Sequence, residues 1–379
     1  MRILHTAFAY PPLVSGVPEV VRQLSERLAQ RGHEVHVATG AVNGCPRTET
    51  RNGVTVHRFD VRGNLVRGIF GEANAYLEFV QSKRWDVSAS HCAQSWSTDL
   101  LFQVKTDTPT VFVPHGLTYR NSAYQGYYGR LAEWLRHNKT MVSLSSSGIE
   151  DGAFRRDYSL GEAVIIPNGV DTGEWAAPAL GVRKAWHRES QPWLLSVSTH
   201  QSVKSHWRLF ELMKQLRSDK HEMHLTQIGR GHRAEKFNLG KLGVRGGCYY
   251  SCMARALFEK SITMMLNLSR AKTVSAVKEA DVTVLTSSFE ASPLVILESM
   301  AAGTPWVSFD VGCVREHAGG RVVNSLSEMA AAIVELMGDA GLRRRLGEEG
   351  KMRIAEQHDW EVVTDRYEQL YRMLQLARQ

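Results

Sequence analysis

Two glutamates attract attention because of their spacing and of the residues between them. Glu290 and Glu298 are eight positions apart in the stretch FEASPLVILESMAAGTP, which spans residues 289–305. This pattern predicts a loop at Glu290 and a helix that begins near Pro293 and carries Glu298 about one turn inside it. The first N–H groups of such a helix have no partners within it and favour an anion such as phosphate. The two carboxylates can accept hydrogen bonds from hydroxyl groups on either side of that anion.

Two further side chains follow predicted strands and could act with these glutamates. Lys204 lies in LLSVSTHQSVKSH, residues 194–206, between an apolar strand and a helix expected to begin near Trp207. A lysine there would present a positive charge to phosphate. His115, in the sequence VPHG, follows a strand in the first half of the chain. A histidine at a strand end can donate or accept a hydrogen bond near a reacting centre.

These residues need a framework of parallel strands to bring them together. The first forty residues indicate an apolar strand over 2–8, a loop that ends at Gly16, a helix over 17–31 and an alternating strand over 34–39. A strand, a helix and a strand with short connections form a βαβ unit, which implies a parallel sheet. Further strands of the same sheet are expected at residues 54–59, 87–90, 110–113, 141–145 and 163–166.

The chain has 379 residues, enough for two domains. A looser stretch over residues 168–192 is expected to be a linker, and residues from 326 onward are mostly helical by pattern. A second set of strands is expected at residues 193–198, 223–228, 262–267, 282–286 and 306–309. The sequence therefore predicts two consecutive α/β domains with ligands bound beyond the carboxyl ends of the strands.

Composition indicates an ordinary globular protein, with 43% hydrophobic and 22% charged residues and a net charge of +7. The basic residues are spread along the chain, so no nucleic-acid tail is expected. The N-terminal sequence favours a strand over a signal peptide, and no apolar run reaches the roughly 18 residues of a membrane span. We expect a cytoplasmic protein, with peripheral membrane contact possible through the aromatic and basic segment 119–139.

Five cysteines are present, an odd number in a large chain, so no disulfide framework is expected. Cys248 and Cys252 are separated by three residues, but no second Cys/His pair is evident in the sequence to complete a zinc set. We therefore expect no metal site.

The stretch around Glu290 and Glu298 resembles the Glu-x7-Glu signature of the retaining glycosyltransferases with the GT-B architecture, especially family 4. That family's pattern runs Glu-Gly-x-Pro-Leu-Val-x-Leu-Glu-Ala-Met-Ala-x-Gly-x-Pro. Similar matches cover nearly the whole chain, at residues 12–35, 166–171 (IPNGVD), 194–206 and 359–361 (DWE). The resemblance implies an α/β fold of two Rossmann-like, doubly wound parallel-sheet domains that face each other across a cleft. It divides the chain into residues 1–170, residues 171–358 and a C-terminal helix over 359–379 that crosses back to the first domain.

The same resemblance implies a retaining glycosyltransferase of the hexosyltransferase type. Its substrates would be a nucleotide-diphosphate sugar and a sugar, lipid-linked or small-molecule acceptor. Lys204 would grip the diphosphate, while Glu290 and His115 would position the transferred sugar. The donor-binding residues would be Gly16, His200, Arg230, Ser292, Pro293, Leu294, Val295 and Glu298. No cofactor is expected, nor a catalytic metal, because no Asp-x-Asp pair is present to hold one.

The chain departs from the family at one position. Ser198-Thr199 replaces the usual Gly-Arg after the strand, so the arginine partner of the lysine is missing. Arginine offers phosphate a bidentate fork, whereas lysine offers only a point charge. Either His200 or Arg230 would have to substitute, and His200 is the preferred candidate.

Three other functions remain open on the sequence alone. The segment Gly229 to Ala234, GRGHRA, imitates the fingerprint of a nicotinamide-dependent oxidoreductase, but no acid follows at the end of the next strand. A nucleotide-sugar epimerase would share the sheet layout and the phosphate site. A non-catalytic binding protein would keep the fold and have lost the activity.

Overall fold

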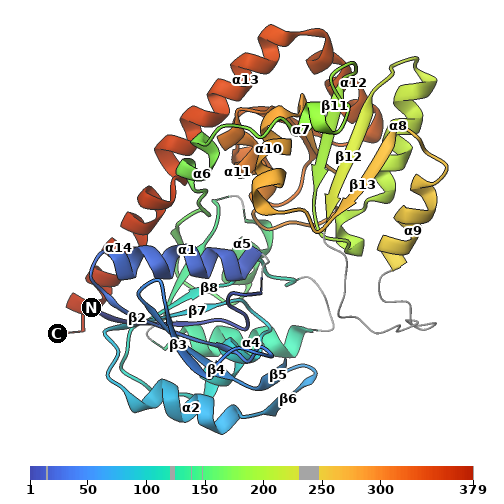
Figure 1. The fold of residues 1–379 in the computed structure, drawn as a ribbon. Helices are drawn as coiled ribbons and strands as arrows, with labels where there is room; N and C mark the ends of the chain where they lie inside the picture. The colour runs from blue at the N-terminus through green and yellow to red at the C-terminus, as the bar shows by residue number, and fades with distance from the viewer. Residues whose placement is uncertain (14–15, 120–123, 138, 147, 230–246, 379) are drawn as a thin grey trace. The chain divides into compact units, whose positions relative to one another are not determined.

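The computed structural model divides the chain into two compact units (Figure 1). The first contains Met1–Gly169 together with Trp360–Gln379, and the second contains Val170–Asp359. The structure describes residues 1–13, 16–119, 124–137, 139–146, 148–229 and 247–378.

The first unit is built on a mainly parallel sheet. Its described strands lie in the order β10-β9-β8-β7-β1-β2-β4-β3, and only β3 and β4 pair antiparallel. Their bounds are β1 Arg2–Thr6, β2 Glu34–Gly40, β3 Thr48–Arg51, β4 Val54–Phe59, β7 Val87–His91, β8 Thr110–Val113, β9 Lys139–Ser143 and β10 Val164–Ile165. A separate antiparallel hairpin consists of β5, Val61–Asn64, and β6, Gly68–Gly71.

Helices cover this sheet because each has one apolar face. In α1 the side chains of Val20, Val21, Leu24 and Leu28 recur at helical spacing and are almost fully buried. The helices of the unit are α1 Gly16–Gln30, α2 Ala73–Ser82, α3 Trp96–Asp99, α4 Gln125–Leu135, α5 Ile149–Asp157 and α14 Trp360–Leu376. Although α14 ends the chain, it lies beside α1 in Figure 1, and Arg31, directly after α1, forms ion pairs with three of its carboxylates.

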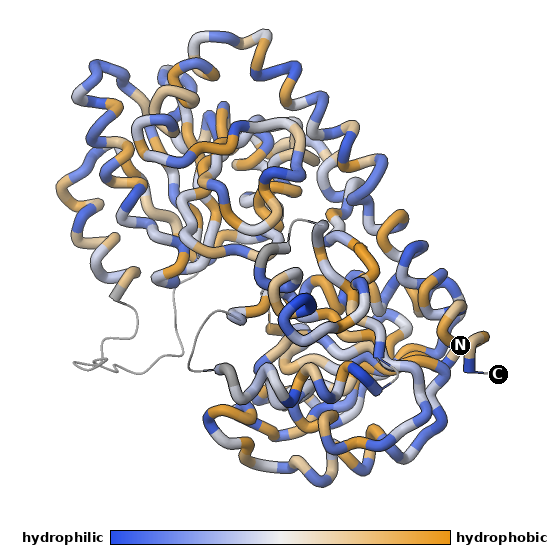
Figure 2. The backbone as a smooth tube through the Cα atoms, turned by 180° about the vertical axis from the view of Figure 1, so that it is seen from behind, coloured by the Kyte–Doolittle hydropathy of each residue, from blue (hydrophilic) through white to orange (hydrophobic). Residues whose placement is uncertain are grey.

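The second unit contains a fully parallel sheet in the order β13-β12-β11-β14-β15-β16. Its strands are β11 Trp193–Val197, β12 His224–Gly229, β13 Ile262–Leu266, β14 Val282–Leu285, β15 Trp306–Phe309 and β16 Gly320–Val323. Its helices are α6 Thr172–Ala176, α7 Val182–Ala185, α8 Trp207–Ser218, α9 Gly247–Ala256, α10 Arg270–Glu279, α11 Leu294–Ala302, α12 Leu326–Gly338 and α13 Ala340–Arg353, which continues into a π-helical turn over Ile354–His358. Hydrophobic stretches gather inside each unit, as the tube in Figure 2 shows.

In both sheets the order of the strands reverses beside the first strand of the unit. In the first unit β1 lies between β2 and β7, and in the second β11 lies between β12 and β14. Such a reversal separates the loops that follow two neighbouring strands and leaves a crevice at their carboxyl ends, where α/β proteins bind ligands. The loops after β1 and β7 and those after β11 and β14 are therefore the places to examine.

Two expectations from the sequence need correction. The stretch 168–192 is not an open linker, because α6 and α7 bury Trp175 and Val182 against the second unit. In segment 119–139, Tyr127, Tyr128 and Trp134 of α4 are buried in the core of the first unit, so these three rings are not available to a lipid surface.

Candidate active site

The loops after β11 and β14 are joined by an ion pair at the reversal point of the second sheet. The ammonium of Lys204 lies 2.6 Å from Oε1 of Glu290, and the hydroxyl of Ser287 donates to the same oxygen at 2.6 Å. The side chains of Lys204 and Glu290 are only 20% and 10% exposed. Two residues separated by 86 positions are thus held together in a partly buried, charged pair.

The backbone fixes this geometry. The amide of Ser288 donates to the carbonyl of Val203 at 2.7 Å, and the hydroxyl of Thr286 donates to the carbonyl of Lys204 at 3.3 Å. Gly312, with a φ of +54°, packs against the chain at Glu290: an added Cβ would lie 2.6 Å from the Glu290 carbonyl oxygen. Only glycine fits so closely there. The loop that carries Glu290 therefore also packs against the loop that follows β15.

Helix α11 starts directly after this loop and points its first turn at the same edge of the sheet. Pro293 is the residue before the helix, and no side chain caps it. Ile296 donates back to Pro293, so the N–H groups of Leu294 and Val295 precede the first intrahelical hydrogen bond. Ser292 lies just outside the helix. This end of the helix offers backbone donors and a positive dipole to an anion.

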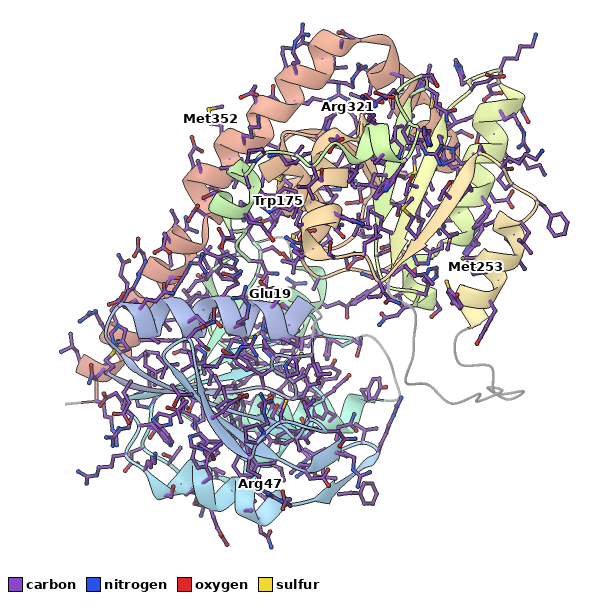
Figure 3. All side chains as sticks on the ribbon, viewed as in Figure 1. Glu19, Arg47, Trp175, Met253, Arg321 and Met352 are labelled. Atoms are coloured by element: carbon purple, nitrogen blue, oxygen red, sulfur yellow. The ribbon has the colours of Figure 1, made fainter. Side chains whose placement is uncertain are left out.

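Glu298 lies on α11 but has a different environment from Glu290. Its carboxylate pairs with Arg270 at the start of α10, and Arg270 also makes a two-point ion pair with Glu174 of α6. The guanidinium of Arg270 lies 5.4 Å from the ring of Trp175, which Figure 3 labels. Glu298 is therefore held in place by a network, and Arg270 is a residue that the sequence did not single out.

In the first unit, His115 follows β8 and contacts a second histidine. Its Nε2 lies 3.0 Å from Nδ1 of His91, which ends β7. His115 has a positive φ of +54°. Two residues on the same edge of the sheet also have a positive φ, Cys92 at +74° and Gln94 at +55°. Non-glycine residues adopt this region rarely, and such conformations concentrate at functional sites.

Burial keeps the two histidines neutral. It lowers the pKa of His115 to about 4 and the pKa of His91 well below its usual value. Nε2 of His91 is buried and has no partner among the described residues. Because an orphaned N–H is less tolerable than an orphaned acceptor, we assign the shared proton to Nδ1 of His91. Nε2 of His115 then accepts it, and His115 carries its own proton on Nδ1, where it can donate to a ligand.

The remaining predicted residues lie in varied places. Gly16 is the exposed first residue of α1, after β1. Arg230 lies outside the described residues. His200 is only 2% exposed, and its Nδ1 lies 4.0 Å from the sulfur of Cys248. A buried ring of this kind cannot replace a phosphate-binding arginine without moving, so the structure argues against that role.

A cation near the site was missed in the sequence. Arg208, in the first turn of α8, donates to the carbonyl of Thr286 at 3.3 Å and lies over the ring of Phe309 at 4.7 Å. It therefore lies against the ends of β14 and β15, beside the loop that carries Glu290. No sequence pattern singled it out, because Lys204 and Arg208 do not share a helix.

Comparison with known proteins now bears on this geometry. A model of glycosyltransferase family 4 matches residues 14–174, and a model of the glycosyl transferases group 1 matches residues 182–353. The chain belongs to the family 4-like glycosyltransferases. The expected family and its GT-B fold of two parallel-sheet α/β domains are thus confirmed.

Full-length relatives of this glycosyltransferase are distant. It is 24% identical over 412 residues to glycogen synthase of Mycobacterium tuberculosis, covering 98% of this chain and 94% of that protein. It is 25% identical over 369 residues to phosphatidyl-myo-inositol mannosyltransferase of Mycolicibacterium smegmatis, covering 94% of this chain and 89% of that protein. These relatives act on different acceptors by name, so they support sugar transfer without identifying the acceptor.

Solved structures share the fold. Sucrose-phosphate synthase from Thermosynechococcus elongatus superposes with a TM-score of 0.80 at 19% identity and covers 99% of each chain. Anabaena HepE, solved in complex with UDP, gives a TM-score of 0.74 at 14% identity and covers 98% of this chain and 99% of its own. No described helix of this glycosyltransferase is long and apolar enough to cross a membrane.

Proposed function

We propose that this glycosyltransferase takes its sugar from a nucleoside-diphosphate donor and transfers it to a hydroxyl acceptor with retention of configuration. The observation that carries the proposal is the edge of the second sheet at β11 and β14. There the Lys204–Glu290 pair lies in the loops that lead to the uncapped start of α11. A diphosphate needs a cation and oriented N–H donors, and this edge provides the two together.

Each side chain has a separate task in the proposed reaction. Lys204 and the first amides of α11 stabilise the charge that grows on the departing diphosphate. Glu290 accepts hydrogen bonds from hydroxyls of the transferred sugar, and Glu298, fixed by Arg270, accepts from the donor. His115 donates from Nδ1 to the sugar as a neutral imidazole.

The family resemblance described above supports retention, and the donor set at this edge supports a reaction without a catalytic divalent cation. A lysine and backbone N–H groups can bind the diphosphate without a divalent metal ion. Solved complexes of Anabaena HepE with UDP and with UDP-glucose support a nucleotide sugar as donor for a protein of this fold.

The proposal is tested by a thermal-shift screen of the purified chain against UDP, GDP, ADP, dTDP and their sugar conjugates. NAD and NADP serve as controls. We expect selective stabilisation by one nucleoside diphosphate, unchanged when Mg²⁺ or Mn²⁺ is added. The anomeric configuration of the product, followed by NMR from the first turnover, then tests retention. A response to NAD or NADP alone would indicate an oxidoreductase. Binding of the sugar nucleotide without transfer to any acceptor would indicate a binding protein.

A further inference from the structure

Two histidines and two cysteines converge in the second unit. His200 and His206 come from the segment that follows β11, and Cys248 and Cys252 come from α9. One ligand atom from each of the four lies within 4.8 Å of every other. The expectation that no histidine pair would complete the cysteine pair was therefore wrong, because the histidines precede the cysteines by more than forty residues.

Three of the distances between ligand atoms are close to those of a tetrahedral metal site. The sulfurs of Cys248 and Cys252 are 4.0 Å apart, and the sulfur of Cys248 lies 3.3 Å from Nδ1 of His206 and 4.0 Å from Nδ1 of His200. Zinc with bonds of about 2.3 Å to sulfur and about 2.05 Å to nitrogen would place ligand atoms about 3.8 Å apart for two sulfurs and about 3.6 Å for sulfur and nitrogen. For these three pairs, shifts of a few tenths of an ångström would reach the tetrahedral values, and the other pairs lie within 4.8 Å.

The spacing along the chain agrees with this geometry. Cys248 and Cys252 are four residues apart on α9, so their side chains share one face of the helix. Met253, labelled in Figure 3, marks this helix. His200 and His206 are separated by five residues, and between them Ser205, with a φ of +49°, turns the chain back. Both spacings fall within the ranges that structural zinc sites use.

The surroundings of the rings prepare them for a metal. Nε2 of His206 bonds to the hydroxyl of Ser198 at 2.6 Å, which leaves Nδ1 directed at Cys248. An outer hydrogen bond of this kind fixes the orientation of a metal-binding histidine. His200 and His206 are 2% and 1% exposed. Nε2 of His200 is buried and has no hydrogen-bond partner among the described residues.

The backbone also makes room for His200. A Cβ at Gly229, the last residue of β12, would lie 3.1 Å from Cδ2 of that ring and 3.0 Å from the carbonyl oxygen of Ser198. A side chain at position 229 would therefore crowd the ring in its present place. A disulfide between Cys248 and Cys252 would need none of these arrangements around the histidines.

We propose that His200, His206, Cys248 and Cys252 bind one zinc ion in a closed, structural site. Four protein ligands leave no position for a water or a substrate, so the ion does not take part in the transfer. Two thiolates balance the charge of the ion, and a set of two sulfurs and two nitrogens favours zinc over magnesium or calcium. The ion ties α9 to the segment that carries Lys204.

Metal analysis of the full chain, purified without a polyhistidine tag after growth with added zinc, tests the site. We expect about one zinc per chain. Replacing zinc by Co²⁺ should give the visible bands of tetrahedral cobalt and a thiolate-to-cobalt charge-transfer band. Cys252→Ser should lose the charge-transfer intensity of one thiolate. It should also weaken zinc binding by more than about tenfold, because loss of an outer hydrogen bond alone weakens metal binding by at least about that factor.

Cys313→Ser is the matched control, because Cys313 also contacts a histidine, with its sulfur 3.3 Å from Nε2 of His317. It should keep one zinc. If Cys252→Ser does not fold, Ser198→Ala removes only the outer partner of His206 and should weaken zinc binding while the fold remains. A wild-type chain without zinc and without the cobalt bands would overturn the proposal, whether its thiols are free or joined in a disulfide. Unchanged zinc affinity in Cys252→Ser or Ser198→Ala, measured by competition with a chelator, would also overturn it.

Discussion

Replacement of Lys204 by alanine tests the proposed diphosphate site most directly. In the structure the lysine does two things, since it neutralises Glu290 and presents a charge at the edge where the donor would bind. Its loss removes a charge-assisted hydrogen bond to phosphate, which is worth about 1 to 3 kcal/mol. We therefore expect binding of the nucleoside diphosphate to weaken by about 5-fold to about 150-fold. Isothermal titration calorimetry with the nucleotide identified in the thermal-shift screen measures this change.

A double-mutant cycle separates the two roles of the lysine. Glu290→Gln removes the charge that Lys204 neutralises, and the double variant then reports what the lysine does without that partner. If Lys204 binds the diphosphate, its removal should weaken binding in the Glu290→Gln background as well. Lys214→Ala, an exposed lysine on α8, controls for the loss of one positive charge from the unit. Unchanged nucleotide affinity in Lys204→Ala, or an effect that vanishes in the double variant, would refute a direct contact with phosphate.

The other predictions concern neighbouring residues and conditions. Glu298→Ala should weaken binding of the sugar nucleotide measured by calorimetry, and full affinity would contradict the donor-binding role. Glu290→Ala should mainly lower turnover in a transferase assay, and wild-type turnover would remove it from the reaction. His5 is buried with its pKa lowered to about 3 by burial, so the unfolded state binds the proton more readily. Acidification from about pH 7.5 to about pH 5.5 should therefore cost up to about 1.4 kcal/mol of stability through this group, and His5→Gln should flatten the pH dependence of the thermal midpoint over that range. A chelator that removes zinc should lower donor affinity, and Zn²⁺ should restore it where Mg²⁺ does not.

Sequence patterns were sufficient to predict most strands of the two sheets. Buried parallel strands have short apolar runs, and the expected positions at 54–59, 110–113 and 306–309 coincide with β4, β8 and β15. The hairpin of β5 and β6 was missed because its short strands are glycine-rich and mostly exposed. β16, Gly320–Val323, was missed because only its last two residues are apolar and it lies at the edge of its sheet.

For the candidate site, the sequence indicated residues but not their partners. Lys204 and Glu290 were each identified, yet their direct contact depends on the adjacency of β11 and β14, which are not consecutive strands. The partner of Glu298, Arg270, lies at the start of a helix that offered no motif. The zinc ligands show the same difficulty, since 42 residues separate His206 from Cys248 and only the folded sheet brings them into contact.

The segment after β11 explains why this chain departs from its family at Ser198-Thr199. In the sequence the loss of the arginine suggested a weaker diphosphate site, with His200 as a replacement. In the structure Ser198 orients His206, and His200 faces the cysteines, so these positions serve the proposed metal site. Lys204 then lies between the two histidines in the chain, in a turn that zinc would hold rigid. A lysine on a rigid turn loses less conformational entropy when it binds phosphate than one on a flexible loop. This smaller loss offsets part of the binding energy that the missing arginine would contribute. A structural zinc and a transfer reaction without a catalytic metal are therefore compatible, and sensitivity to chelators alone would not distinguish the zinc from a metal in the reaction.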